Sequence, residues 1–374
     1  MRWTRSARIT GLVFALLLAV GAAIATRPAP PQIPDVVRRF MDREGIPGAV
    51  VAFGAAGRAP TVMAIGAADT VSGRPMRADM IFRLASLSKP LTAAAVMSLV
   101  AQGKIGLDEH LADISAEVGQ AADPRHRDIT VRLLLQHGGG WDRASSFDPL
   151  LDDAEAQRRL GFAAGGDCAP IARAMLALPL DTAPGTVQSY SNLGYCWLAA
   201  AIARRAGMAY EDYVRTAVLA PLGLPEIRLG EAEQPEERLV RHHLNAGGRL
   251  APLPRGAASE TWLRRLGPAG GWTGTAADFY RFAAVAPPGE TATRPGFAAA
   301  ESYYGLGWRI WPDASGPLLT HAGFVDGVFT LAVRTADGDV AVALFNANTR
   351  TDSLAAMQRL IFELRAALPT RAGR

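Results

Sequence analysis

The chain has 374 residues, of which 49% are hydrophobic and only 20% are charged, with 39 basic against 35 acidic residues. This length and composition suit a globular protein with one large core or two closely packed lobes, and no internal repeat is present. Three of the arginines lie within residues 1–25, which contain no acid, so the rest of the chain holds 36 basic and 35 acidic residues. That balance gives no support for nucleic-acid binding.

Residues 1–25 have the pattern of an export signal. Three arginines precede the apolar run ITGLVFALLLAVGAAIA, which ends in the small residues of Ala23-Ile24-Ala25. This order is typical of a signal peptide cleaved before Thr26. An uncleaved membrane anchor is the competing interpretation, although the run is short for a span. We therefore expect a periplasmic or secreted protein, with residues 26–34 as a proline-rich linker.

The next elements are a predicted hairpin and a helix with an unusual start. Two β-rich runs between Ile46 and Ala64 are separated by a Gly-Arg turn, which predicts a β-hairpin. The stretch FRLASLSKPLTAAAVMSLVAQG follows, and Pro90 within it fits only the first turn of a helix. Ser86 and Lys89 would then share one face at the positive end of that helix, where an amine can take the proton of a hydroxyl. A helix cap with a solvated lysine is the alternative for this motif alone.

Helical patterns continue to about Leu222, most of them ended by Gly or Pro. Within this region, HGGGW at His137–Trp141 is similar to the oxyanion loop of lipases with the α/β-hydrolase fold. No serine here lies in the G-x-S-x-G elbow which that fold requires. Tyr190-Ser191-Asn192 opens a later helix and offers a phenol that can carry a proton. Its asparagine amide can hold both Lys89 and a substrate carbonyl.

The cysteines and the remaining histidines suggest no metal site. Cys168 and Cys196 can form one disulfide in an oxidising compartment, with two buried free thiols as the alternative. The adjacent pair His242-His243 has no third ligand at a suitable spacing. We expect His110 and His126 to lie at the surface.

Strand-like patterns return near the end of the chain. Residues 228–271 are polar, rich in Gly and Pro, and predict no clear element. A short helix (AADFYRFAAV), the strand-like runs YGLGWRIW, GVFTLAVRT and GDVAVALFNA, and the amphipathic helix TDSLAAMQRLIFELRAAL follow. His321-Ala322-Gly323 lies between strand-like runs, where glycine would let a substrate backbone approach. The next backbone N–H, that of Phe324, could donate to an oxyanion.

The order of the elements predicts an α+β fold. Strands at both ends of the chain favour one antiparallel β-sheet flanked by N- and C-terminal helices, with a large helical lobe inserted at about residues 91–260. We expect this domain to span residues 35–366, followed by a tail at 367–374. A cleft between the two lobes is a natural place for a site.

Three motifs in this order resemble the serine β-lactamase and penicillin-binding-protein superfamily, especially its class C-like and esterase branch. They are the S-x-x-K of Ser86 and Lys89, the Y-x-N of Tyr190 and Asn192, and the H-x-G of His321 and Gly323. The resemblance extends from about Asp35 to Leu364. It implies the sheet with an inserted helical lobe that the order of elements also predicts.

The resemblance also implies a role for each matched residue. Ser86 would attack a carbonyl and form an acyl-enzyme, without a cofactor. Lys89 and Tyr190 would share the role of base, and Tyr190 would later activate the deacylating water. Asn192 would orient the substrate, and the backbone N–H groups of Ser86 and Phe324 would form the oxyanion hole.

The third motif departs from the usual Lys-Thr-Gly of β-lactamases. Ala322 removes the hydroxyl, and His321 would be only partly charged near neutral pH. This argues for a carboxylic ester or small amide as substrate, with β-lactam or D-amino-acid peptide hydrolysis as the alternative. Trp141 would wall the substrate pocket, unless it is a buried structural residue. A non-catalytic, membrane-tethered binding or sensor module is the alternative from another functional class.

Overall fold

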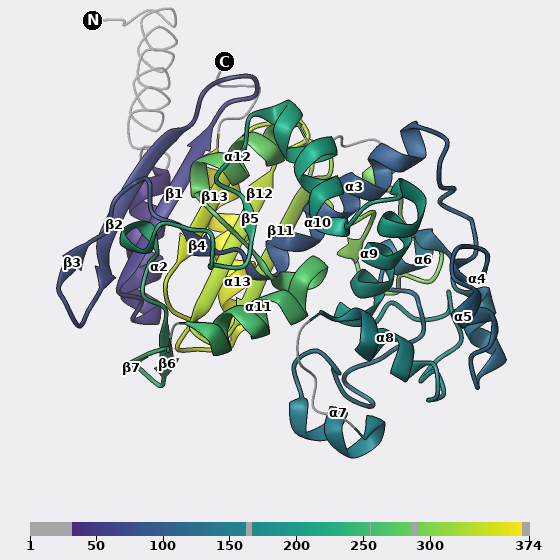
Figure 1. Ribbon diagram of the computed structural model, residues 1–374. Helices are drawn as coiled ribbons and strands as arrows, with labels where there is room; N and C mark the ends of the chain where they lie inside the picture. Colours follow the sequence, from purple (N-terminus) through teal and green to yellow (C-terminus); the bar gives the residue numbers. More distant parts are fainter. Residues whose placement is uncertain (1–31, 162–166, 255, 286–289, 369–374) are drawn as a thin grey trace, which may run out of the picture. The chain divides into compact units, whose positions relative to one another are not determined.

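An eight-stranded antiparallel sheet is the centre of the computed structural model, which describes residues 32–161, 167–254, 256–285 and 290–368 (Figure 1). The predicted export segment, most of the linker and most of the tail lie outside these ranges. Across the sheet the strands are β3 (Arg74–Pro75), β2 (Thr61–Asp69), β1 (Gly48–Gly54), β13 (Val340–Phe345), β12 (Val328–Arg334), β11 (Leu318–Val325), β10 (Arg309–Trp311) and β9 (Tyr303–Tyr304). Figure 1 shows the purple β1 beside the yellow-green β13, so the sheet is built from both ends of the chain, as predicted.

Alternation along the strands gives the sheet two apolar faces. Val51 belongs to the core covered by α2 (Ile33–Glu44) and α13 (Ser353–Ala367), and its neighbour Val50 belongs to the core on the other face. On the first face, the ring of Phe40 lies 5.2 Å from that of Phe345. On the second, α12 (Ala276–Val285) packs on β1 and β13. Both faces are therefore buried, which explains the strongly hydrophobic strands.

The inserted region is a lobe of helices around α9 (Asn192–Ala206). The helices that contact α9 are α3 (Ser88–Ala101), α4 (Leu111–Ile114), α6 (Val131–Leu135), α8 (Ala169–Met175), α10 (Tyr210–Tyr213) and α11 (Ala257–Gly270). The lobe also contains α5 (Ala116–Gly119) and α7 (Asp153–Leu160). A disulfide joins Cys168, directly before α8, to Cys196 in α9. Of the two alternatives that the sequence left open for the cysteines, the structure has the bridge.

The polar region at 228–271 contains more structure than its sequence predicted. It holds β5 (Arg228–Leu229), the hairpin of β6 (His243–Ala246) and β7 (Arg249–Pro252), and α11. With β4 (Phe82–Arg83) and β8 (Trp272–Gly274), β5 forms a small three-stranded sheet. The pattern of α11 is interrupted because Gly267, at φ 34° and ψ −111°, breaks the helix just before Pro268. This helix also crosses the predicted lobe boundary near residue 260.

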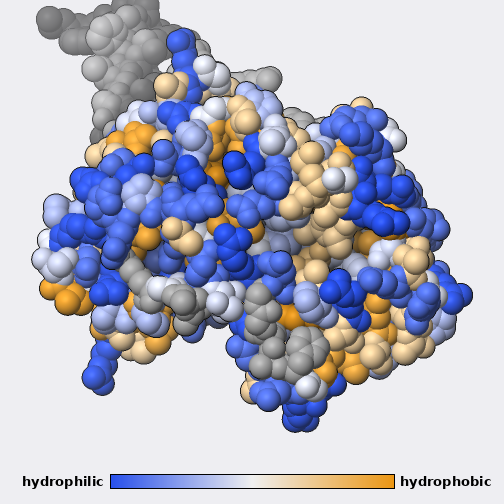
Figure 2. Space-filling view, viewed as in Figure 1, coloured by the Kyte–Doolittle hydropathy of each residue, from blue (hydrophilic) through white to orange (hydrophobic). Residues whose placement is uncertain are grey.

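The face shown in Figure 2 is largely hydrophilic, with hydrophobic residues confined to separate smaller areas. Within the described ranges, no helix is both long enough and apolar enough to cross a bilayer.

Candidate active site

Ser86 lies in a tight turn directly before a helix. The 3₁₀ turn of residues 85–87 leads straight into α3, and Pro90 is the third residue of that helix, where its missing N–H removes no helical hydrogen bond. The preceding residue, Ala85, has a φ of 47°, a conformation that residues other than glycine rarely adopt. Such local strain persists only where the surroundings impose it, and it is frequent at functional sites.

Strand β11 packs directly on this turn, and Gly323 makes the close approach possible. A Cβ atom at Gly323 would lie 2.8 Å from both Ala85 Cβ and Leu84 O, and 2.3 Å from Thr330 Oγ1. Thr330 Oγ1 donates to Leu84 O at 3.0 Å, which ties β12 to the same turn. These contacts show that Gly323 seats the strand against the turn that carries Ser86. Its predicted role of admitting a substrate backbone is not tested by them and stays a prediction. The motif also lies inside β11 rather than between strands.

Lys89 is fully buried, and its amine lies among three oxygen atoms. Nζ is 3.2 Å from Ser86 Oγ and donates to Asn192 Oδ1 and to Ala269 O, both at 2.7 Å. Burial lowers the pKa of Lys89 well below its ordinary value, although the charge of Asp148 opposes the shift. In its neutral form, which burial favours, the amine keeps two N–H groups for Asn192 and Ala269 and has a lone pair for the Ser86 proton.

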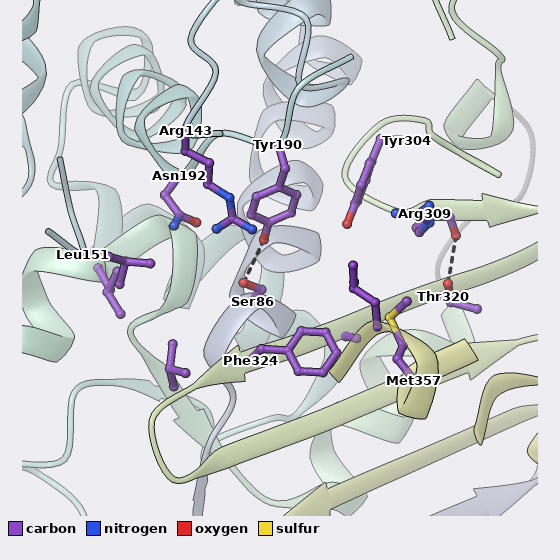
Figure 3. A pocket seen from close by; sticks show the side chains of 14 residues that line it. Ser86, Arg143, Leu151, Tyr190, Asn192, Tyr304, Arg309, Thr320, Phe324 and Met357 are labelled. Carbon is purple, nitrogen blue, oxygen red and sulfur yellow. Dashed lines mark hydrogen bonds between the residues drawn. The ribbon is translucent and has the colours of Figure 1, made fainter. Parts of the chain in front are cut away.

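Tyr190 approaches Ser86 from the other side. Its hydroxyl donates to Ser86 Oγ at 2.8 Å, as Figure 3 shows. Burial raises the pKa of Tyr190 well above its ordinary value, and the nearby Tyr304 adds to this effect. The phenol therefore keeps its proton at neutral pH. These two pKa directions make Lys89 the better proton acceptor of the two, and the predicted sharing of the base role stays a prediction.

The ring of Tyr190 rests on a histidine whose role the sequence did not predict. His137 lies 4.3 Å from Tyr190 between ring centroids, and its own φ is 57°. Its Nδ1 accepts a hydrogen bond from the backbone N–H of Ser191 at 3.2 Å. Burial lowers the pKa of His137 well below its ordinary value, so this ring is neutral. The HGGGW loop thus supports the phenol, rather than forming an oxyanion hole as in lipases.

Asn192 is fixed by an acid that sequence reasoning missed. Its Oδ1 accepts from Lys89, and its Nδ2 donates to Asp148 Oδ2 at 2.7 Å. Together these bonds define which way the amide faces. Asp148 lies in the loop between α6 and α7, where no periodic pattern or motif marked it.

His321 differs from the prediction. It is only 1% exposed, and burial lowers its pKa to about 3, so the ring is neutral near neutral pH rather than partly charged. Along β11 the side chains alternate, and the neighbours Thr320 and Ala322 line the pocket while His321 does not. The predicted direct substrate contact of His321 is therefore not supported. Its ring lies 5.8 Å from that of Tyr304 instead.

Trp141 is also away from the pocket. It is 6% exposed and belongs to the hydrophobic core, where its ring lies 5.9 Å from that of His126. The structural alternative for Trp141 is thus the one observed. His126 is fully buried, so its predicted surface position is wrong, whereas His110 is exposed as predicted. In the part of the chain that the structure describes, no cluster of His, Cys, Asp or Glu is arranged to hold a metal ion.

Ser86, Tyr190 and Asn192 face a pocket of about 270 Å³ (Figure 3). Its polar lining also includes two arginines, Arg143 and Arg309, but no carboxylate among the described residues. The remaining lining residues are Leu151, Leu266, Tyr304, Thr320, Ala322, Phe324, Val325, Leu354 and Met357. The pocket therefore combines an apolar wall with two cations around the nucleophile.

The chain matches known proteins across this whole region. The family model described as Beta-lactamase matches residues 33–366. The chain belongs to this family of serine hydrolases. Membership confirms the resemblance that the three motifs predicted.

Curated relatives cover the chain to different extents. Penicillin-binding protein 4 of Amycolatopsis lactamdurans is 29% identical over 313 residues, which cover 77% of this chain and 78% of that protein. Esterase EstB of Burkholderia gladioli is 34% identical over 191 residues, which cover 48% of this chain and 45% of that protein. The probable fimbrial assembly protein FimD, serogroup H1, of Dichelobacter nodosus is 34% identical over 145 residues, which cover 37% of this chain. The chain thus spans only about a third of the length of that relative.

Solved structures share the fold. The D-amino acid amidase from Ochrobactrum anthropi SV3, solved with L-phenylalanine, has a TM-score of 0.71 at 22% identity, covering 90% of this chain and 97% of that chain. EstCE1, a hydrolase with promiscuous acyltransferase activity, has a TM-score of 0.70 at the same identity and coverage. The predicted α+β fold with an inserted helical lobe is confirmed.

Proposed function

We propose that this protein is an exported serine hydrolase that cleaves a carboxylic ester or a small amide through an acyl-enzyme on Ser86. The observation that carries the proposal is the position of Ser86 Oγ between the amine of Lys89, at 3.2 Å, and the hydroxyl of Tyr190, at 2.8 Å. A serine hydroxyl is a weak nucleophile, and a neighbouring base is what activates it.

Acylation needs one proton acceptor and one proton donor. Ser86 Oγ attacks the carbonyl carbon while its proton passes to the neutral amine of Lys89. The oxyanion accepts hydrogen bonds from the backbone N–H groups of Ser86 and Phe324, which lie at the turn and at β11. When the intermediate collapses, the bond to the leaving alkoxide or amine breaks. The leaving group takes a proton from Tyr190, which regains one from Lys89.

Deacylation repeats these steps with water. A water molecule occupies the place of the leaving group and gives its proton to the Tyr190–Lys89 pair as its oxygen attacks the acyl carbon. Collapse then breaks the ester bond to Ser86 Oγ, which recovers its proton. No cofactor is required at any step of this scheme.

The pocket favours an ester or small amide as substrate. The third motif offers neither a hydroxyl, because Ala322 replaces it, nor a charge, because His321 is buried and neutral. An apolar wall that includes Phe324 and Met357 suits a short acyl or alcohol group. Esterase EstB and the D-amino acid amidase among the similar proteins support the same substrate classes by their names.

One observation favours the second candidate, β-lactam or D-amino-acid peptide hydrolysis. Arg309 lines the pocket beside Thr320 and could bind a substrate carboxylate without the lysine of the usual motif. The name of penicillin-binding protein 4 of Amycolatopsis lactamdurans points the same way. This candidate uses the same acyl-enzyme chemistry, so only a comparison of hydrolysis rates on different substrates can distinguish the two candidate functions.

A substrate panel tests the proposal. We expect wild-type protein to hydrolyse short p-nitrophenyl esters faster than nitrocefin or D-Ala-D-Ala peptides, and Ser86→Ala to abolish all of these activities while leaving the fold intact. A fluorophosphonate should label the wild type at Ser86 only. Substantial turnover by Ser86→Ala would refute the nucleophile. Absence of both labelling and turnover would favour the non-catalytic binding module.

Export is a separate part of the proposal. It rests on the arginines and apolar run of residues 1–25, together with a disulfide that suits an oxidising compartment. Mass spectrometry of protein expressed in a bacterial host should find a chain that begins at Thr26. A full-length chain that fractionates with membranes would show an anchor instead.

A further inference from the structure

Arg143 occupies the pocket in a way that the proposed chemistry does not use. Its guanidinium carbon lies 4.8 Å from the centre of the Tyr190 ring, whose hydroxyl bonds to Ser86. Figure 3 shows Arg143 beside Asn192, on the opposite side of Tyr190 from Arg309. The positive charge of Arg143 thus lies next to Tyr190, the residue whose hydroxyl bonds to the nucleophile Ser86.

The hydrogen-bond donors of Arg143 remain available. Within the described part of the chain its guanidinium makes no hydrogen bond, and it forms an ion pair with Asp148 Oδ2 at 3.8 Å. That oxygen already accepts a hydrogen bond from Asn192 at 2.7 Å. By contrast, Arg309 donates to Ser302 Oγ at 2.7 Å and stacks on Tyr304. Of the two arginines in the pocket, Arg143 is the one whose planar fork is free to bind an anion.

The backbone around Arg143 is held in place. The preceding residue, Asp142, accepts hydrogen bonds from Ser189 Oγ at 2.6 Å and from the backbone N–H of Ala144 at 3.0 Å. Its own N–H donates to Asp181 Oδ2 at 2.7 Å. Because Ser189 is the residue before Tyr190, these bonds connect the loop of Arg143 to the segment that carries the phenol. Because the backbone of this loop is already held, it loses little conformational freedom when Arg143 binds an anion.

We propose that Arg143 binds a carboxylate of the substrate, so that the natural substrate carries an acidic group within a few bonds of the scissile carbonyl. The inference rests on the proposed serine hydrolase function and narrows its substrate class. A lining with two arginines and no carboxylate among the described residues supports it, because an anion there meets two opposite charges. The carboxylate of Asp148, which pairs with Arg143, is not part of the lining and accepts a hydrogen bond from Asn192. The guanidinium fork pairs with both oxygens of a carboxylate.

Matched esters test this inference. Mono-p-nitrophenyl succinate carries the anion on the acyl side, and p-nitrophenyl pentanoate is a neutral ester of similar size. 4-Acetoxybenzoate and 4-acetoxytoluene form the corresponding pair for the leaving group. In at least one pair we expect Arg143→Ala to lower the ratio of kcat/KM for the anionic over the neutral ester about tenfold, as for a charge-assisted hydrogen bond. Arg143→Glu should lower it further.

Salt gives a readout that a structural role would not change. In the wild type, KM for the preferred anionic ester should rise with ionic strength, because ions screen an exposed charge pair, and in Arg143→Ala this dependence should be lost. Arg158→Ala is the matched control, because it removes an exposed arginine of α7 that is outside the pocket lining. Its ester ratio should equal that of the wild type.

The outcomes separate this inference from the proposed function. Hydrolysis of neutral esters tests the function alone. An unchanged ratio in Arg143→Ala for both pairs would overturn the inference. If kcat/KM also fell equally for anionic and neutral esters, Arg143 would act on Tyr190 instead. Calorimetric titration of Ser86→Ala, with and without Arg143→Ala, measures binding of the same anionic esters without turnover. Equal affinity of both proteins would also overturn it.

Discussion

The same physical cause gives the residues around Ser86 their protonation states. Burial disfavours whichever form of a group is charged, so it lowers the pKa values of Lys89 and His321 and raises that of Tyr190. Tyr190 and His321 are therefore neutral at neutral pH, and burial favours the neutral form of the Lys89 amine. The charge of the pocket is left to Arg143 and Arg309, which are at least partly exposed. The proposed mechanism thus assigns proton transfer and substrate recognition to different residues.

The lowered pKa of Lys89 predicts the pH dependence of acylation. Only the neutral amine can accept the Ser86 proton, so kcat/KM for a neutral ester should fall as the pH falls through the pKa of Lys89. Because burial lowers that pKa, the plateau should be reached well below pH 10.5, the ordinary lysine value. A pH–rate profile with p-nitrophenyl pentanoate measures this. A rise in rate only near the ordinary lysine pKa would contradict a neutral resting amine.

Tyr190→Phe isolates the role of the phenol hydroxyl. The ring keeps its contacts with His137 and Tyr304, while the donor to Ser86 Oγ is lost. We expect kcat to fall at least roughly 10²-fold, as for other residues that transfer protons, with little change in the melting temperature. Stopped-flow measurement of the acylation burst shows which half-reaction is slowed. Near-normal turnover in this variant would mean that Lys89 acts alone.

At the scale of elements, the sequence predicted most where a regular pattern met a local constraint. Pro90 placed the start of α3 beside Ser86, and the strand-like C-terminal runs GVFTLAVRT and GDVAVALFNA predicted β12 and β13. The prediction was weakest where backbone geometry interrupts the pattern, as at Gly267 in α11. It also missed Asp148 and Arg143, because these side chains lie in a loop and reach the site only through tertiary structure. The convergence of three distant motifs was predictable only through their resemblance to a family.

Gly323→Ala tests the contact between β11 and the turn of Ser86. The added methyl would lie under 3 Å from atoms of Ala85, Leu84 and Thr330, so the strand must move. We expect a loss of about 1–3 kcal/mol in the free energy of unfolding, as for other overpacked sites, and a fall in kcat as Phe324 moves away from Ser86. Urea denaturation and ester kinetics measure the two effects.

The matched control for this variant is Gly119→Ala in α5, where an added methyl meets no atom within 4 Å. It should leave both the stability and the kinetics nearly unchanged. If Gly323→Ala behaved like this control, the glycine would have no packing role at this contact.

At the scale of the whole molecule, the site lies where segments far apart in sequence meet. The turn of Ser86 and strand β11 contact each other, and the helical lobe supplies Tyr190 and Asn192 to the same pocket. Covering both faces of the sheet with helices leaves the sheet itself rigidly packed. Within the lobe, several helices are short, and a covalent link between α8 and α9 compensates for the limited packing that short helices provide.

The disulfide should therefore contribute substantially to stability. Cys168 and Cys196 are 28 residues apart, and closing a loop of that length in the unfolded chain is worth about 3–4 kcal/mol by the chain-entropy argument. We expect the double variant Cys168→Ala/Cys196→Ala to lose most of this amount in urea denaturation. Wild-type protein measured under reducing conditions should match it, which separates loss of the bond from any repacking around alanine. Equal stability of oxidised wild type and double variant would show that the bridge constrains nothing, and would remove one support for export to an oxidising compartment.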